Sequence, residues 1–191
     1  MSTGRMEAFS DGVIAIIITI MVLELRVPHE ATFRALVPLA PVLLSYLLSF
    51  VFIGIYWSNH HHLLHIAEHV DGRALWANLH LLFWLSLVPF VTAWMGENHF
   101  AAVPVAIYGM ILFLAGVAYT ILARVLISLD GADSRIAAAL GKDYKGKLSV
   151  VGYSLAIPLA FVRPWLAFVF YGAIAVMWLA PDRRIERSIT S

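Results

Sequence analysis

Long apolar runs separated by short polar stretches dominate this chain, and their lengths predict where helices lie. A helix that spans a membrane needs about 20 mostly apolar residues. Runs of this length predict four spanning helices, at about 6–25, Leu36–Trp57, 74–95 and 102–127. The remaining apolar stretch, Leu148–Ala180, is too long for one span, and Arg163-Pro164 interrupts it. We therefore expect two short spans there, joined by a tight turn, and six spans in all.

Polar stretches refine this division. The second helix is expected to continue past Trp57 as far as His65, until Asp71-Gly72-Arg73 breaks the chain. The most polar stretch is Ser128–Lys147. Within it, Asp130-Gly131 predicts a turn, and Ser134–Leu140 predicts a short surface helix.

Composition indicates an integral membrane protein. Of its 191 residues, 61% are hydrophobic and 13% are charged, whereas soluble domains are about 45–50% apolar and about 25% charged. Cysteine is absent, which excludes disulfides, thiolate metal sites and cysteine nucleophiles. The length predicts one domain over residues 1–191. Acidic Glu7 and Asp11 ahead of the first apolar run argue against a cleaved signal peptide.

The positive-inside bias gives an orientation for six spans. With the N-terminus inside, three basic residues fall on the outer side: Arg26, Arg34 and Arg163. The inner side then holds the rest of the 13 Lys and Arg residues: Arg5, Arg73, Arg124, Arg135, Lys142, Lys145, Lys147, Arg183, Arg184 and Arg187. We therefore expect a plasma or inner membrane protein with both termini in the cytoplasm, and the basic tail as a topology determinant rather than a nucleic-acid site.

The first apolar run combines a charge-free stretch with polar groups. Taken at 100° per residue, one side of the helix carries Ile16, Thr19, Ile20 and Leu23, and Gly12 lies on the same side. Several copies around an axis would present these side chains as successive rings, which is one way to gate a channel. Nearly every side of this helix is apolar, however, so periodicity alone favours a lipid-facing or packing face over a pore-lining one.

A specific motif surrounds this run. The pattern Arg5-x-x-x-Phe9-Ser10-Asp11, followed by Gly12-x-x-Ala15-Ile16-x-x-Thr19-x-x-x-Leu23-Glu24, resembles the first-helix signature of the transmembrane protein 175 family. These are endosomal and lysosomal potassium channels and their prokaryotic relatives. Further residues resemble the second and third helices of that family: Trp57 with His60 and His61, the stretch Asn78–Ser86, Pro89-Phe90, Thr92 and Gly96.

The resemblance implies an all-α fold with six spanning helices per repeat. This chain holds one repeat, so the resemblance implies a homotetramer in which four first helices line a central pore without a carbonyl filter. By position, Ile16 matches the narrow apolar constriction, Ile20 and Leu23 match further pore-lining turns, and Thr19 matches a polar layer that contributes to selectivity. Potassium ions and the lipid bilayer are the implied partners, and no cofactor or nucleic acid is expected.

The same resemblance implies that the motif residues Arg5, Phe9, Ser10 and Asp11 attach the first helix to its neighbours. A buried polar side chain in a membrane needs a partner, because leaving it unpaired is costly. Candidates at a comparable depth are His60, His61 and Asn78.

Two other patterns offer different interpretations. Val150-Val151-Gly152-Tyr153-Ser154 looks like a potassium filter sequence but lacks its leading Thr and second Gly, so we expect the start of a helix there.

Histidines provide the second pattern. His61, His65 and His69 recur every fourth residue and would share a face if the second helix persisted. They are expected to be structural, with pH modulation or metal binding as the other possibilities. The alternative functions are accordingly a proton-permeable channel or proton-coupled carrier and, from another class, a histidine-dependent membrane metal enzyme.

Overall fold

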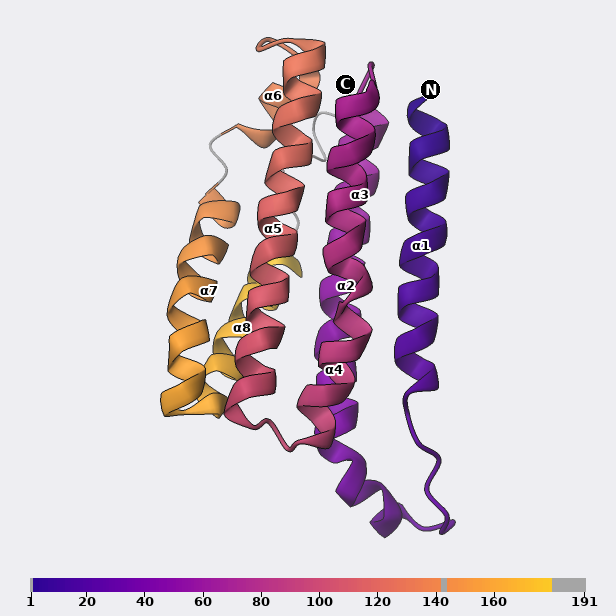
Figure 1. Ribbon diagram of the computed structural model, residues 1–191, viewed down its shortest axis with the longest axis vertical. Helices are drawn as coiled ribbons and strands as arrows, with labels where there is room; N and C mark the ends of the chain where they lie inside the picture. The colour runs from indigo at the N-terminus through magenta and orange to yellow at the C-terminus, as the bar shows by residue number, and fades with distance from the viewer. Residues whose placement is uncertain (1, 142–143, 180–191) are drawn as a thin grey trace.

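The computed structural model describes residues 2–141 and 144–179, and every regular element in that part of the chain is helical. Figure 1 shows the long helices side by side along one axis, with α1 at one edge of the bundle and α7 at the other. In chain order the elements are α1 (Thr3–Leu23), the 3-10 helix η1 (Phe33–Leu39), α2 (Ala40–Ile66), α3 (Gly72–Ser86), α4 (Val88–Glu97), α5 (Ala102–Asp130), α6 (Arg135–Leu140), α7 (Tyr144–Val162) and α8 (Pro164–Leu179).

The expected all-α membrane fold is confirmed. In the described part of the chain, five helical stretches are long and apolar enough to cross a membrane, and α8 is a shorter apolar helix of 16 residues. At 1.5 Å per residue, α8 is about 24 Å long, somewhat less than a hydrocarbon core of about 30 Å. The expected end of the last span, at Ala180, lies outside the described residues.

The prediction of one continuous helix over 74–95 is wrong. The structure divides this span into α3 and α4 at Leu87, whose N–H bonds to the Trp84 carbonyl at 3.3 Å. Pro89 explains the division, because proline has no N–H and its ring clashes with the carbonyl four residues earlier, here that of Leu85. Together α3 and α4 still form one apolar span, Gly72–Glu97.

Helix ends elsewhere follow local sequence signals. The second helix continues through the histidines to Ile66, as expected, and Asp71 then caps α3 by accepting hydrogen bonds from the backbone of Arg73 and Ala74 at 2.9 and 3.1 Å. The side chain of Arg73 also donates to Asp71 and lowers the pKa of this carboxyl. The cap is therefore ionised at neutral pH, which favours a helix N-terminus.

The remaining boundaries also agree with the predicted ones to within a few residues. Ser134 caps α6 by accepting from the Ala137 N–H at 3.3 Å, and α7 begins at Tyr144, four residues before the expected start. Arg163 separates α7 from α8, where the sequence places its interruption.

Buried polar side chains join the helices inside the bundle. Ser49 of α2 lies 2.7 Å from the Thr92 hydroxyl of α4 and 3.0 Å from the Tyr108 hydroxyl of α5. All three side chains are buried. This cluster holds α4 against α2, and α4 in turn packs against α1.

A glycine permits the closest approach between α5 and α8. The Tyr171 hydroxyl of α8 donates to the Val105 carbonyl at 3.1 Å, and its ring crosses α5 at Gly109. A Cβ at Gly109 would overlap the Tyr171 hydroxyl oxygen. The glycine at this position is therefore a packing requirement.

Replacing Gly109 with alanine should displace Tyr171 and lower the free energy of unfolding by about 1–3 kcal/mol, as overpacked cores do. Gly116→Ala on the same helix is the matched control, because its Cβ would lie 3.6 Å from the Tyr56 hydroxyl, an ordinary contact. The control should be neutral or more stable, since alanine favours a helix by about 1 kcal/mol over glycine. Unfolding of the purified protein in detergent measures both, and equal stabilities would contradict the packing argument.

Candidate functional site

Helix α1 buries one stripe of side chains against the rest of the bundle. The stripe has helical spacing and consists of Met6, Ser10, Ile14, Ile17 and Met21. It packs against α2, α3 and α4, whereas α5, α7 and α8 lie farther from α1. One side of α1 is therefore committed to its own chain.

Another side of α1 is uncovered, and it carries the residues predicted to line a pore. Ile16, Ile20 and Leu23 are 60%, 42% and 76% exposed. Thr19 is also exposed and donates its hydroxyl hydrogen to the Ala15 carbonyl at 2.8 Å, which leaves the hydroxyl oxygen as an acceptor. A Cβ at Gly12 would meet nothing within 4 Å. We call these five positions, Gly12, Ile16, Thr19, Ile20 and Leu23, the open face of α1.

A buried hydrogen-bond chain attaches the N-terminal half of α1 to α2 and α3. The Ser10 hydroxyl donates to the Met6 carbonyl at 2.8 Å, and the Asn78 amide nitrogen donates to Ser10 at 2.9 Å. The Asn78 amide oxygen lies 2.7 Å from His60 Nε2. Ser10, Asn78 and His60 are 0%, 2% and 1% exposed, so these hydrogen bonds are shielded from solvent.

The available hydrogens fix which atom donates and which accepts in the bonds between Ser10, Asn78 and His60. Because the Ser10 hydrogen is used on Met6, Ser10 accepts the bond from Asn78, and the Asn78 oxygen must face His60. An amide oxygen only accepts, so His60 Nε2 carries the hydrogen. His60 Nδ1 is then the free ring nitrogen, and it is the buried side-chain atom without a hydrogen-bond partner within the described residues.

Two further contacts join α1 to α2 near the same end of the bundle. Asp11 accepts a hydrogen bond from the Trp57 indole at 3.0 Å, and Glu7 pairs with His61 Nδ1 at 2.6 Å. The Trp57 and His61 rings stack, with centroids 6.1 Å apart. These contacts are partly exposed, so they surround the buried chain rather than extend it.

The structure gives two of the four predicted anchoring residues, Ser10 and Asp11, a partner on another helix. Ser10 accepts a hydrogen bond from Asn78, which in turn bonds to His60. Asp11 accepts from Trp57, which the sequence singled out without giving it a partner. Phe9 is 53% exposed, and Arg5 is exposed without a side-chain partner in the part of the chain that the structure describes. Sequence reasoning missed the pairing of Glu7 with His61, because no motif marks Glu7 and its partner lies on another helix.

The histidine repeat does not form one face. The rings of His61 and His65 stack at 6.0 Å, but α2 ends at Ile66, so His69 lies beyond it and pairs with Asp130 at 3.0 Å. Among residues 2–141 and 144–179, no group of three or more His, Cys, Asp or Glu could hold a metal ion. The described contacts of these three histidines are the ion pairs of His61 and His69 and the ring stacking between His61 and His65.

The filter-like sequence is helical, as expected. Val150–Ser154 lies inside α7, and the buried Tyr153 ring packs 6.0 Å from that of Tyr171. Its position within α7 rather than at the start of the helix reflects the earlier beginning at Tyr144.

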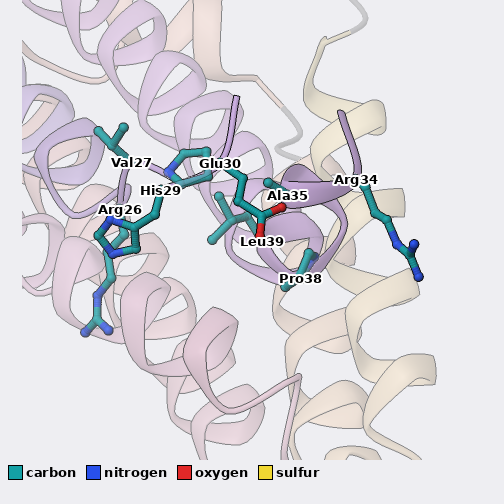
Figure 2. A pocket seen from close by; sticks show the side chains of 9 residues that line it. Arg26, Val27, His29, Glu30, Arg34, Ala35, Pro38 and Leu39 are labelled. Carbon is teal, nitrogen blue, oxygen red and sulfur yellow. The ribbon is translucent and has the colours of Figure 1, made fainter. Parts of the chain in front are cut away.

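A surface hollow of about 500 Å³ lies in the segment that joins α1 to α2. Its lining includes Arg26, His29, Glu30 and Arg34. Figure 2 shows the two arginine side chains pointing away from one another rather than converging. The hollow therefore lacks the convergent polar groups of a ligand site.

The fold defines a multi-pass α-helical membrane protein, and the known proteins that it resembles are ion channels. Residues 5–89 match the model of the endosomal/lysosomal potassium channel TMEM175. A potassium channel of Chryseobacterium sp. (strain P1-3) is 51% identical over 189 residues, covering 99% of this chain and 98% of the relative. A crystal structure of a lysosomal potassium-selective channel TMEM175 homolog from Chamaesiphon minutus matches with a TM-score of 0.79 and 31% identity, over 93% of this chain and 96% of that one.

The chain belongs to the TMEM175 family. A more distant relative, the human endosomal/lysosomal proton channel TMEM175, is 34% identical over 96 residues, which are 44% of this chain and 19% of the human protein. The family is one of ion channels and not of enzymes, so the histidine-dependent metal enzyme is rejected as a function for this chain.

The buried hydrogen bonds from Ser10 through Asn78 to His60 predict the effect of replacing Asn78. Asn78→Leu keeps the volume but leaves Ser10 without its donor and His60 without its acceptor, and should lower the free energy of unfolding by about 1–3 kcal/mol. Ser86→Ala is the control on the same helix, because Ser86 is exposed and its hydroxyl donates to the Phe83 carbonyl of that helix. Denaturation in detergent gives both values. An Asn78→Leu variant as stable as the control would mean that these buried hydrogen bonds do not contribute to the free energy of unfolding.

Proposed function

We propose that four copies of this chain form a passive potassium-permeable channel, with four α1 helices around a central pore. The observation that carries this proposal is the open face of α1. Its own chain leaves Ile16, Ile20 and Leu23 uncovered, although the same helix buries a stripe on its other side. Relatives named as potassium channels, which match nearly the whole chain, support potassium as the permeant ion.

Apolar rings on the open face would act as gate and size filter together. A narrow ring of isoleucine excludes water when closed and conducts only when it widens or hydrates. Thr19 lies between Ile16 and Ile20 in height and offers a hydroxyl oxygen that its own hydrogen bond leaves free to accept. In this proposal, Ile16 forms the narrowest constriction and Thr19 a polar layer beside it.

We propose that selectivity arises on α1 and needs no carbonyl filter. Val150–Ser154 is the stretch that most resembles a filter sequence, and its backbone belongs to α7. Carbonyls in a helix interior are occupied by helical hydrogen bonds and cannot replace the hydration shell of an ion. This helical conformation supports a pore without such a filter.

We also propose that the chain lies in a plasma or inner membrane with both termini in the cytoplasm. Successive spans alternate in direction in Figure 1. Arg5, Arg73 and Arg135 consequently begin helices at one end of the bundle, and Arg26 and Arg163 follow helices that end at the other. The positive-inside bias puts the first end in the cytoplasm.

A proton-permeable channel is the second candidate, and the name of the human relative favours it. Proteoliposomes under separate potassium and proton gradients discriminate the two functions, because reversal potentials follow the gradient of the permeant ion. We expect potential to follow potassium, and a detergent-solubilised particle with the mass of four chains by light scattering. Reversal that follows protons, or a monomeric particle, would refute the proposal.

The constriction can be tested by a polar substitution. Ile16→Asn should hydrate the ring, raise potassium flux on the order of tenfold, equivalent to about 1.4 kcal/mol of barrier, and weaken discrimination against sodium. Val22→Asn is the matched control, since Val22 is 45% exposed but lies about 120° from Ile16 around the helix. Unchanged flux in Ile16→Asn, or an equal rise in both variants, would place the pore elsewhere.

A further inference from the structure

An ion pair between Arg26 and Glu97 joins the chain just beyond α1 to the end of α4. The Arg26 Nη2 atom lies 2.8 Å from Glu97 Oε1. Arg26 follows the last residue of α1 by three positions, and Glu97 is the last residue of α4. Both helices finish at the end of the bundle opposite the N-terminus (Figure 1). Between described residues, this pair is the one polar side-chain contact that residues 12–32 make with another helix.

The end of α4 holds Glu97 in a fixed place. A carboxylate there does not stabilise α4 itself, because a helix C-terminus carries partial negative charge and repels anions. The helix instead closes through its backbone: the N–H groups of His99 and Phe100 bond to the carbonyls of Gly96 and Met95 at 3.2 and 3.0 Å. Gly96 also lies so close to α2 that a Cβ would overlap it. The role of Glu97 is therefore to be found in its partner, Arg26.

Without Glu97, the end of α1 would attract Arg26. The C-terminus of α1 carries partial negative charge. In its last turn, the carbonyls of Met21 and Leu23 accept no hydrogen bond from described residues beyond the helix. Arginines near a helix end bond to such carbonyls, and three residues span at most about 11 Å, so the Arg26 side chain can reach them. The pairing with Glu97 therefore decides where the Arg26 charge lies.

We infer that Glu97 is a positioning residue for the outer entrance of the pore: it holds Arg26 against α4 and leaves the end of α1 to potassium. Leu23, the last residue of the open face, lies in that last turn of α1. In the proposed tetramer four such helix ends surround the entrance, and their negative charge attracts cations. An arginine on each end would repel them. The effect on ion entry rests on the proposed channel function, whereas the position of Arg26 does not.

Potassium flux through proteoliposomes at two ionic strengths tests this inference. At about 10 mM KCl, where charges interact over about 30 Å, Glu97→Gln should lower flux about threefold or more. At about 1 M KCl, where this range is about 3 Å, the variant should match the wild type within about twofold. Adding Arg26→Gln to Glu97→Gln should restore flux at low salt, because no freed cation then lies at the entrance.

Glu30→Gln is the matched control. Glu30 lies in the same linker as Arg26, is exposed, and forms no ion pair with another described residue. Its replacement removes the same charge without releasing an arginine, so flux should stay near that of the wild type. Three results would overturn the inference: full flux in Glu97→Gln at low salt, an equal loss in Glu30→Gln, or a double variant as slow as Glu97→Gln, which a merely structural role would give.

A second measurement locates Arg26 without conduction. Because the chain has no cysteine, Glu24→Cys places a single thiol at the exposed C-cap of α1. Its reaction rates with anionic and cationic methanethiosulfonates, measured in detergent at low salt, report the charge beside it. Adding Glu97→Gln should raise the ratio of anionic to cationic rate about threefold or more, and adding Arg26→Gln should reverse the rise.

The thiol experiment separates the position of Arg26 from the channel function. A rate ratio that ignores Glu97→Gln, or a rise that persists with Arg26→Gln, would overturn the placement of Arg26 by Glu97. The expected ratios in a protein that conducts no potassium would instead refute the proposed channel function and leave the position of Arg26 standing.

Discussion

In a bilayer, a polar side chain that leaves water must find a protein partner, because unpaired polar groups cost several kcal/mol there. The chain from His60 through Asn78 to Ser10 meets this requirement with three almost completely buried side chains from three helices. The rotation of α1 depends on it. Ser10 must point inward to reach Asn78, and residues on the far side of α1 consequently point away from their own chain.

This rotation separates two roles on one helix that is apolar on nearly every side. The stripe that includes Ile14 and Ile17 packs against α2, α3 and α4, whereas Ile16 and Leu23 remain uncovered. The same residue type therefore packs at one position and stays open at the next. Hydrophobicity alone cannot assign these roles, because lipid, a neighbouring helix and a pore constriction all accept isoleucine.

The helices around α1 are themselves positioned by individual residues, such as a proline that divides one helix and a glycine that lets two helices approach closely. Pro89 divides the third span, and its second half, α4, packs against α1 while the Ser49 and Thr92 hydroxyls hold α4 to α2. At the other side of the bundle, Gly109 allows the Tyr171 ring to cross α5. The position of α1 thus depends on contacts among several other helices and not on the sequence of α1 alone.

The sequence by itself determined the membrane class, the number and approximate bounds of the apolar helices, and the family, since bilayer thickness translates directly into run length and the motif around Ser10 and Asp11 is specific. It also contained Pro89, whose effect on the third helix was not predicted. Only the tertiary structure decided that Asp11 meets Trp57, that His69 lies beyond the helix of His61, and that His60 Nδ1 has no hydrogen-bond partner among the described residues. Each of these depends on how helices rotate and end against one another, and that is decided by partners far away in the sequence.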